Sequence, residues 1–429
     1  MSKELRMHWL RHAKKFWGEF LATMWTRMCG LRMIPEKGPF AELWGLDPET
    51  VFLNHGSFGA APIAVREEQD RIRNDMEKDP VYFVERRMKN LWNASIFELS
   101  RFLNADPEGM VFVTNATMGV NTVLRSLKLS PGDEIIVPDH AYQACKNAID
   151  FVTGRSGART VIVHVPFRVD DDSEIIEPIL SAVTSRTVLA MIDTVSSPTG
   201  VRMPFESLVY LLQDRGVDVL VDAAHGPGIV PLNISELNPA YITGNCHKWM
   251  CTPKGSAFLH IREDKRGKIS PLSIGHGYSS DLPAAEKFRF EFDWSGTRDP
   301  SPWLCIPFSI EYLGSQIKGG WEEIMRKNKE MILQGRELVC EALETTAPTP
   351  DSMISSMSSI ELPGGGKVLP SPPDGEPTHN LLYDQYRIQV PIIAWPIHGV
   401  KYIRISAHIY NTKEEFEYLS ESLKSILGS

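Results

Sequence analysis

Short apolar runs alternate with amphipathic segments along most of the chain. After a charged helical pattern at residues 67–101, five runs are almost continuously apolar, at residues 109–114, 133–138, 158–166, 186–193 and 217–224. Segments with helical spacing of their apolar residues separate them. Continuously apolar strands separated by helices are typical of a mostly parallel sheet covered on both faces. The pattern therefore predicts a large, doubly wound α/β domain.

The pattern changes beyond Pro302. Residues 319–344 predict a long amphipathic helix, residues 363–377 a surface loop rich in proline and glycine, and residues 383–427 two strands and a terminal helix. This is the pattern of a smaller α+β domain. We divide the chain into an N-terminal extension (1–44), an arm that joins the small domain (45–66), the large domain (67–301) and the small C-terminal domain (302–429).

The first 35 residues carry seven Lys and Arg but two acids. Apolar residues recur there at helical spacing, at Leu10, Ala13, Trp17, Phe20, Leu21 and Met24. A helix packed on the protein or on a partner subunit is the interpretation we favour. A basic amphipathic helix that lies on a membrane surface or directs targeting is the alternative. No run of 18 uncharged apolar residues is present, so no transmembrane helix is expected.

Composition narrows the classes of function. A formal net charge of −9 argues against a nucleic-acid-binding surface. The six cysteines show no paired spacing such as C-x-x-C, so we expect neither disulfides nor a structural metal. A reducing, cytoplasmic location is expected, and targeting to an organelle by the N-terminal segment is left open.

Polar residues follow the predicted strands. Five clusters occur at these positions: Asn115–Thr117, Asp139–Tyr142, Asp193–Ser197, Asp222–His225 and His247–Lys248. Ligands of doubly wound sheets bind beyond the carboxyl ends of the strands. The five clusters therefore predict a single site.

Lys248 stands between a strand predicted to be buried and a Pro-Lys-Gly turn, in a segment with few other charges. An ordinary exposed lysine is one interpretation. A lysine with a lowered pKa is instead a nucleophile that forms Schiff bases, as with pyridoxal 5′-phosphate. Asp222 ends a buried strand and fits the pyridine nitrogen of that cofactor, although aspartate is also a common helix cap.

Further residues match the needs of the same cofactor. His225 could contact its O3′ atom or ring, or be a packed structural histidine. Tyr142 could stack on the ring and act as an acid or base, or be an ordinary half-buried aromatic residue. The backbone N–H groups of Ala116 and Thr117 precede a helix and suit a phosphate, with the Thr117 hydroxyl and His247 as further donors.

Arg404 lies in the alternating strand pattern "YIRIS". An inward guanidinium needs an anion, and a bidentate pair with a carboxylate would hold an amino acid. An internal salt bridge is the alternative.

The combination of "VDAAH", "GNCHKWMCTPKGSAFLHI", "WSGTRDPSPWL" and "YIRISAHIYNT" resembles the class V aminotransferase superfamily of pyridoxal-phosphate enzymes. The segment "VFLNHGSFGAAP", residues 51–62, is similar to the opening motif of its isopenicillin N epimerase-like branch. That branch also contains cysteine desulfhydrases and hercynylcysteine sulfoxide lyases. The resemblance covers about residues 45–425 and implies the PLP-dependent transferase fold (fold type I).

The resemblance also implies roles for individual residues. Lys248 would form the Schiff base, Asp222 would pair with the pyridine nitrogen, and Tyr142 would stack on the ring. The other implied cofactor contacts are His225 and Ser197 near O3′, and Asn115, Ala116, Thr117 and His247 at the phosphate.

Two further sets of contacts are implied by the resemblance. Gly296 and Thr297 would reach the phosphate of a neighbouring subunit, which implies a homodimer with shared active sites. Arg404 would bind the substrate α-carboxylate, with Asn54 and His55 nearby.

The reaction is less narrowly predicted than the cofactor. Cysteine desulfurases carry a mobile cysteine shortly before this arginine, whereas residues 390–404 contain none, so a persulfide-forming enzyme is not expected. We expect a C–S lyase of the cysteine desulfhydrase or hercynylcysteine sulfoxide lyase type. The alternatives are an amino-acid epimerase, a class V aminotransferase, and a scaffold protein that uses the fold without catalysis.

Overall fold

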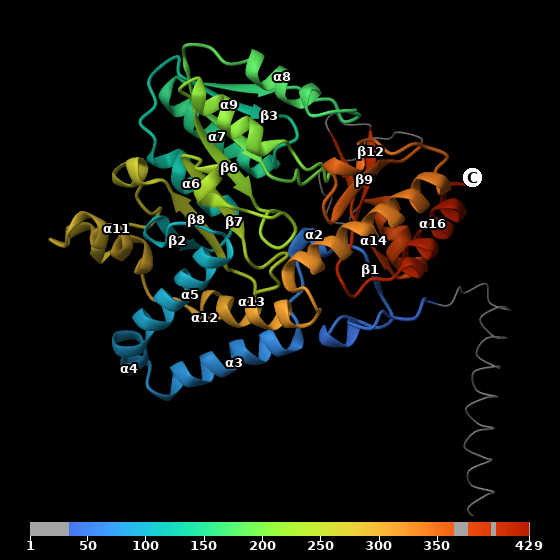
Figure 1. Ribbon diagram of the computed structural model, residues 1–429, viewed down its shortest axis with the longest axis horizontal. Coiled ribbons are helices and arrows are strands. Elements are labelled where there is room, and N and C mark those ends of the chain that lie inside the picture. Colours follow the sequence, from blue (N-terminus) through green and yellow to red (C-terminus); the bar gives the residue numbers. More distant parts are fainter. Residues whose placement is uncertain (1–33, 364–375, 396–399, 429) are drawn as a thin grey trace, which may run out of the picture.

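A seven-stranded sheet forms the centre of the larger part of the computed structural model, which describes residues 34–363, 376–395 and 400–428 (Figure 1). The predicted N-terminal helix lies outside the described residues. The strand order is β2-β8-β7-β6-β5-β3-β4. The strands are β2 (Met110–Val113), β3 (Glu134–Pro138), β4 (Arg159–Val163), β5 (Thr187–Asp193), β6 (Asp218–Ala223), β7 (Tyr241–Asn245) and β8 (Ala257–Ile261). Only the two pairings that involve β8 are antiparallel, so the prediction of a mostly parallel sheet is confirmed.

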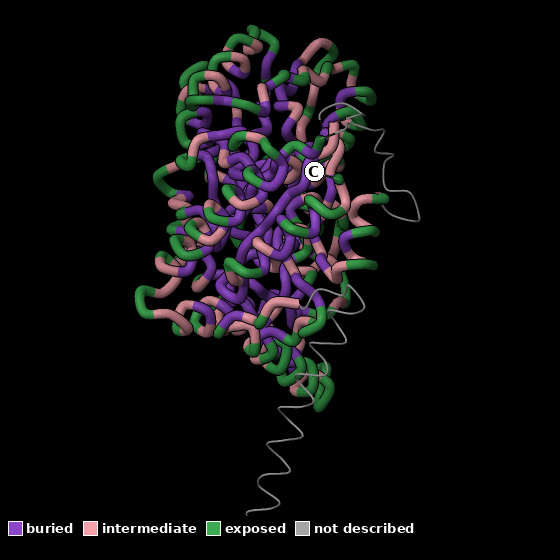
Figure 2. The backbone as a smooth tube through the Cα atoms, turned by 90° about the vertical axis from the view of Figure 1, so that its right-hand side faces the viewer, coloured by how far each residue is buried: buried purple, intermediate pink, exposed green. Residues whose placement is uncertain are grey.

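Helices cover both faces of this sheet, as predicted. One face packs against α6 (Ala116–Ser126), α7 (Gln143–Ser156) and α11 (Ala284–Asp293). The other packs against α5 (Met88–Phe102), α8 (Ser173–Ser181), α9 (Phe205–Asp214) and α12 (Ser301–Leu304). Alternate residues of β6 enter the two cores, Leu220 on one side and Val221 on the other, which explains why residues 219–221 are all apolar. The buried backbone runs through the middle of the molecule (Figure 2).

Strand β4 departs from the predicted pattern of full burial. It lies at the edge of the sheet, and Ile162 is 56% exposed. An edge strand has a neighbour on one side only, so its apolar sequence does not by itself lead to burial.

The smaller part has a three-stranded antiparallel sheet of order β11-β12-β9. Its strands are β9 (Met357–Glu361), β11 (Ile392–Ala394) and β12 (Lys401–Ser406). Helices α14 (Gly320–Ala342) and α16 (Lys413–Leu427) share its apolar core, and α15 (Pro377–Tyr386) lies beside α16. The α+β prediction is therefore confirmed.

Residues 383–427 contain three short strands instead of the two predicted. The additional strand is β10 (Ile388–Gln389), which pairs with β1 (Val51–Phe52) and not with the antiparallel sheet. Pro391 separates β10 from β11, and proline has no N–H to continue a ladder. The pairing brings the segment before α2 (His55–Phe58) beside the C-terminal part of the chain.

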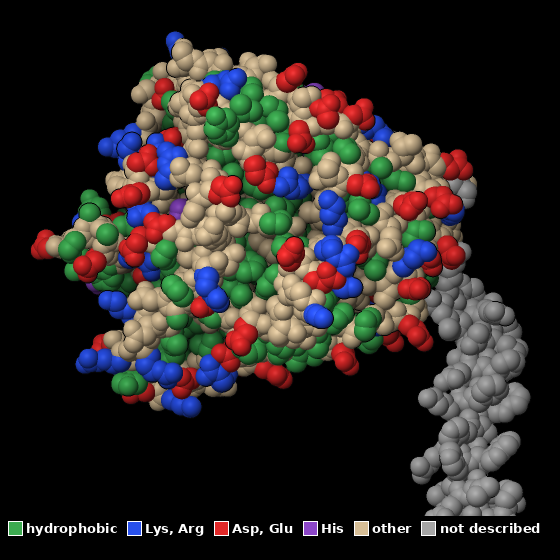
Figure 3. All heavy atoms as spheres, viewed as in Figure 1, with side chains coloured by type: hydrophobic (Ala, Val, Ile, Leu, Met, Phe, Trp, Pro, Cys, Tyr) green, Lys and Arg blue, Asp and Glu red, His purple; other side chains and the backbone are tan. Residues whose placement is uncertain are grey.

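Acidic and basic side chains are interspersed over the face of the molecule in Figure 3. Within the residues that the structure describes, none of the helices has both the length and the apolar character needed to cross a membrane.

Candidate active site

Lys248 lies in the loop after β7, at the edge of the sheet where the polar clusters were predicted to meet. Its Nζ is 2.9 Å from His225 Nε2, and its side chain is only partly buried. His225, by contrast, is 1% exposed. The lysine amine is thus held against a buried ring while solvent, or a ligand, can still reach it.

The hydrogen bonds of His225 determine the protonation of this pair. The indole N–H of Trp249 can only donate, and it does so to His225 Nδ1 at 3.2 Å. A neutral imidazole whose Nδ1 accepts carries its proton on Nε2. That Nε2–H points at Lys248 Nζ, so the lysine must accept it and must be an uncharged amine.

The electrostatics of the site agree with this arrangement. Burial lowers the pKa of the Lys248 amine to about 7, and the charge of Arg404 contributes to this lowering. Burial also lowers the pKa of His225 well below its usual range, with Lys248 as the next cause. In its neutral form the Lys248 amine can act both as a nucleophile and as a base.

Asp222 is the penultimate residue of β6 and is 2% exposed. Its Oδ1 accepts the Ala224 N–H at 2.9 Å, and its Oδ2 accepts the thiol of Cys145 at 3.3 Å. No salt bridge to it occurs among the described residues. Burial raises the pKa of its carboxyl, since neither donor carries a charge that could compensate for desolvation. The carboxylate can therefore accept a further, charged donor.

Arg404 lies on β12 and is 4% exposed. Its Nη1 donates to the Ser197 carbonyl at 2.5 Å and contacts the Ser197 hydroxyl at 3.3 Å, while Nη2 donates to Ser57 Oγ at 2.9 Å. Its Nε is buried without a partner in the described structure. Burial lowers the pKa of the guanidinium to about 10. An internal salt bridge, the alternative considered from the sequence, is not found for Arg404 within the described ranges.

Asn54 reaches the guanidinium only through a second residue. Its Oδ1 accepts the hydroxyl of Ser57 at 2.6 Å, and Ser57 in turn accepts from Arg404. Asn54 immediately precedes α2 and Ser57 lies within it, so the N-terminal arm fixes the position of a side chain that comes from the C-terminal sheet.

The turn before α6 differs in detail from the expectation. Asn115 Oδ1 caps the helix by accepting from Met118 N at 2.8 Å. The Ala116 N–H, which was predicted to bind a phosphate, instead donates to Asn245 Oδ1 at 2.8 Å. The N–H and hydroxyl of Thr117 have no hydrogen bond in the part of the chain that the structure describes, and they are the groups this turn offers to an anion.

His247 also has one nitrogen in use. Its Nδ1 lies 2.8 Å from the Ser256 carbonyl and must donate to it. In the neutral ring Nε2 then carries a lone pair, and burial lowers the pKa of His247 to about 4. His247 can donate to a phosphate through Nε2 only when its ring is protonated.

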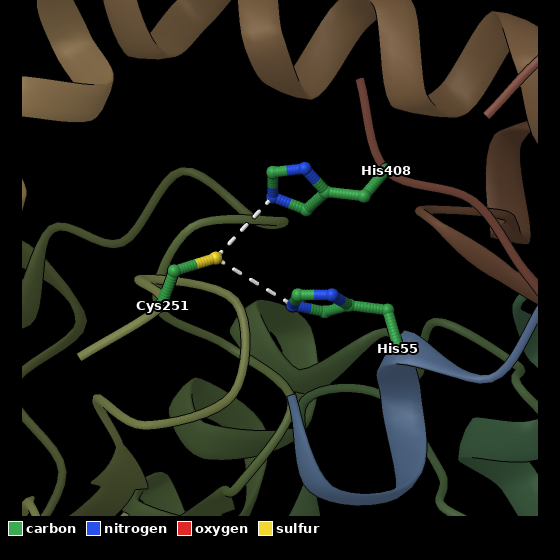
Figure 4. Close-up of side chains that lie close together, drawn as sticks. All are labelled: His55, Cys251 and His408. Atoms are coloured by element: carbon green, nitrogen blue, oxygen red, sulfur yellow. Dashed lines mark hydrogen bonds between the residues drawn. The ribbon is translucent and has the colours of Figure 1, made fainter. Parts of the chain in front are cut away.

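His55 contacts the backbone of Lys248 and lies beside Cys251 and His408 (Figure 4). Its Nε2 is 3.0 Å from the Lys248 carbonyl, its Nδ1 is 2.9 Å from the Tyr410 hydroxyl, and burial lowers its pKa to about 3. Cys251 Sγ lies 3.6 Å from His55 Nε2 and from His408 Nε2. These donor types can bind a metal ion. Both nitrogens of His55 already have hydrogen-bond partners, however, so we interpret the cluster as a support for the lysine loop.

Tyr142, Gly296 and Thr297 lie at the surface of the chain. Tyr142 immediately precedes α7 and is 47% exposed. Gly296 and Thr297 are exposed, and Gly296 has a φ of +122°, which favours glycine.

Two contacts of the site were not predicted from the sequence. Ser57 binds Arg404, although the motif that contains it was recognised, and Cys145 binds Asp222. Cys145 follows Tyr142 by about one helical turn, and nothing in the sequence alone indicates which residue of β6 it meets.

Comparisons with known proteins identify the family of the chain. The family model described as aminotransferase class-V matches residues 84–365. The isopenicillin N epimerase of Amycolatopsis lactamdurans is 31% identical over 395 residues, which cover 89% of this chain and 96% of that protein. The L-cysteine desulfhydrase of Arabidopsis thaliana is 31% identical over 408 residues, which cover 87% of each protein.

The fold has counterparts among solved structures. The apo cysteine desulfurase from Thermococcus onnurineus NA1 matches with a TM-score of 0.74 at 20% identity, over 92% of this chain and 100% of that one. The predicted fold type is therefore confirmed. By the extent of the family match and the identity to these relatives, the chain belongs to the aminotransferase class-V family.

Proposed function

We propose that the protein is a pyridoxal 5′-phosphate-dependent C–S lyase that acts on an amino acid with sulfur at Cβ. One observation carries the proposal: at the carboxyl end of the central sheet a neutral lysine amine lies near a buried carboxylate, and the Arg404 guanidinium reaches this edge from β12. Among the described residues the carboxylate has no salt bridge, and neither has the guanidinium. The similarity to an L-cysteine desulfhydrase supports the choice of C–S cleavage.

The residues fit the cofactor in three respects. The Lys248 amine is uncharged and reachable, as attack on an aldehyde requires. Asp222 has two uncharged donors and can accept a pyridinium N–H. Thr117 has an N–H and a hydroxyl without partners among the described residues, at the N-terminus of α6, where a phosphate is favoured. When bound, the cofactor supplies an electron-withdrawing ring that stabilises negative charge at Cα of the substrate.

The chain's own residues bind and orient the substrate and move its proton. Arg404 binds the α-carboxylate through guanidinium N–H groups that its contacts leave free, and Ser57 and the Ser197 carbonyl hold the guanidinium in place. Lys248 removes the proton from Cα, since it is a neutral base. His225 keeps that amine oriented through Nε2–H. Loss of the thiol from Cβ and uptake of one water then yield pyruvate and ammonium, without net oxidation.

The remaining predicted residues have supporting roles in this proposal. Tyr142 stacks on the ring, Ser197 lies near O3′, and Asn115 and His247 border the phosphate. Asn54 acts through Ser57, and His55 acts through the backbone of Lys248. Ala116 contributes by fixing the turn through Asn245.

We further propose that the active unit is a homodimer. Gly296 and Thr297 are exposed and lie outside the site of their own chain in this proposal, which fits a role in the partner's phosphate site. We also retain the division of the chain at residues 44, 66 and 301, and a cytoplasmic location, as proposals.

Epimerisation is the second candidate. The relative from Amycolatopsis lactamdurans is named an isopenicillin N epimerase, and removal of the Cα proton would be common to both reactions. The two reactions differ in the next step, in which a lyase expels the Cβ substituent whereas an epimerase returns a proton to the opposite face.

A substrate panel tests the proposal. The holoenzyme is incubated with L-cysteine, S-alkyl-L-cysteine sulfoxides and pairs of D- and L-amino acids that lack a leaving group. We expect pyruvate and a sulfur product from the first two classes. Inversion of the third class without pyruvate from any substrate would replace the lyase by the epimerase, and α-keto acid with formation of the amine form of the cofactor would indicate an aminotransferase.

A further inference from the structure

Cys145 is the one side chain that donates a hydrogen bond to Asp222 among the described residues. It is completely buried on the first turn of α7, and its Sγ lies 3.3 Å from Asp222 Oδ2. Burial and the neighbouring carboxylates raise the pKa of this thiol, so it stays protonated and must be the donor. The other carboxylate oxygen is held by the backbone N–H of Ala224.

The surroundings of Asp222 explain why this donor matters. Asp193 on β5 is paired with Asp222 in register and is 3% exposed, and its Oδ2 has no partner in the described part of the chain. Burial raises the pKa of Asp193, and the charge of Asp222 contributes to this rise. A charged Lys248 would lower the pKa of Asp222. Because the amine beside His225 Nε2–H is neutral, the thiol and the Ala224 amide are the groups that stabilise the carboxylate among the residues that the structure describes.

From this geometry we infer that Cys145 is a positioning residue that sets, through its S–H bond to Oδ2, how strongly Asp222 holds the proton of the pyridine nitrogen. This inference rests on the proposed function. A thiol is a weak donor, so it fixes the orientation of the carboxylate and lowers its basicity only modestly. The proton then stays on the ring nitrogen while the carboxylate remains its counter-ion.

A purely structural role is the alternative, since Cys145 also belongs to the apolar core between α7 and the sheet. The two roles predict that different residues replace Cys145 best. If Cys145 only fills space in the core, valine should replace it best, because valine has a similar size and no hydrogen-bond donor. If the hydrogen bond from Cys145 to Asp222 matters, serine should replace it best, because serine keeps an O–H donor at nearly the same place.

The test compares Cys145→Val, Cys145→Ala and Cys145→Ser. The control is Cys340→Val, which changes another buried cysteine in a helix, in the core of the smaller part. Each apoprotein is reconstituted with pyridoxal phosphate labelled with ¹⁵N in the ring. The ring-nitrogen resonance, the dissociation constant of the cofactor, kcat and KM are measured.

We expect valine and alanine to move the ¹⁵N resonance towards the unprotonated position and to lower kcat about tenfold at unchanged KM, because a hydrogen bond to a charged group is lost. Serine should leave the resonance near its native position, and Cys340→Val should change neither. An unmoved resonance in both Val and Ala, or equal shifts in Val and Ser, would overturn the inference. Native protein that does not take up the cofactor would instead contradict the proposed function.

Discussion

His225 Nε2 lies 2.9 Å from Lys248 Nζ, and the opposite nitrogen of the same ring accepts the indole N–H of Trp249. The tryptophan thereby selects the tautomer of the histidine, and the tautomer selects the neutral form of the lysine. Trp249, a buried residue outside the proposed cofactor contacts, thus controls the charge of the proposed nucleophile.

Trp249→Phe should shift the ionisation of Lys248 upward. Phenylalanine has no N–H, so His225 can move its proton to Nδ1 and accept from a charged lysine through Nε2. In the native apoprotein the rate of cofactor uptake should rise as pH increases through about 7, because the amine, whose pKa lies there, loses its proton. In Trp249→Phe this rise should occur at higher pH.

The matched control is Trp303→Phe. Trp303 is also buried and donates to a backbone carbonyl, that of Val113, far from Lys248 in sequence. The Trp303→Phe variant should lose stability through a similar loss of side-chain volume, but its rate of cofactor uptake should depend on pH as in the native protein. Identical profiles for native protein and Trp249→Phe would contradict the role of the indole.

Lys248→Ala should abolish covalent attachment of the cofactor. Reduction of the native holoenzyme with borohydride should leave the modified group on Lys248, as peptide mass mapping would show. Lys254→Ala is the control, since Lys254 donates to the Gly59 carbonyl and is not assigned to the cofactor. A reduced adduct on Lys254 would refute the assignment.

Asp222→Asn should impair turnover far more than cofactor binding. An amide cannot act as the counter-ion of a pyridinium, so the ring loses much of its capacity to stabilise charge at Cα. A preorganised electrostatic partner of this kind contributes about 10²–10³ in kcat. Steady-state kinetics measure the effect on turnover, and equilibrium binding measures the effect on cofactor affinity. A near-native kcat would mean that the ring is oriented differently.

Arg404→Lys should raise KM for amino acids about tenfold to a hundredfold, because lysine cannot reproduce a planar two-point contact with a carboxylate. The absorption of the bound cofactor should not change. Arg336→Lys serves as the control, since Arg336 is buried but already paired with Asp351. If Arg404→Lys reduces the thermal midpoint and leaves KM unchanged, the guanidinium has a structural role.

Shared active sites can be tested with two defective subunits. Lys248→Ala and Thr297→Ala each damage every site of their own homodimers. In mixed dimers with shared sites, one site receives an intact lysine from one chain and an intact threonine from the other. Random mixing should therefore restore native cofactor affinity in about a quarter of all sites. No recovery after subunit exchange would show that Thr297 does not act across a dimer interface.

The alternation of apolar runs and amphipathic segments was enough to predict the mostly parallel sheet, because strands buried on both faces cannot tolerate polar residues except at their ends. For the same reason the sequence located Asp222 and Lys248 at the edge where ligands bind. These are local properties of single segments, and each can be recognised without knowing its neighbours.

The contacts that give the site its chemistry depend on residues far apart in the chain. The Ala116 N–H is used by Asn245, the carboxylate of Asp222 is held by Cys145, and Arg404 is fixed by Ser57 and Ser197. Each of these partners is an ordinary residue in its own segment. Only the tertiary structure decided which of them meet, because a hydrogen bond depends on distance and direction in space, and these arise from the packing of helices and strands that the sequence pattern of one segment does not contain.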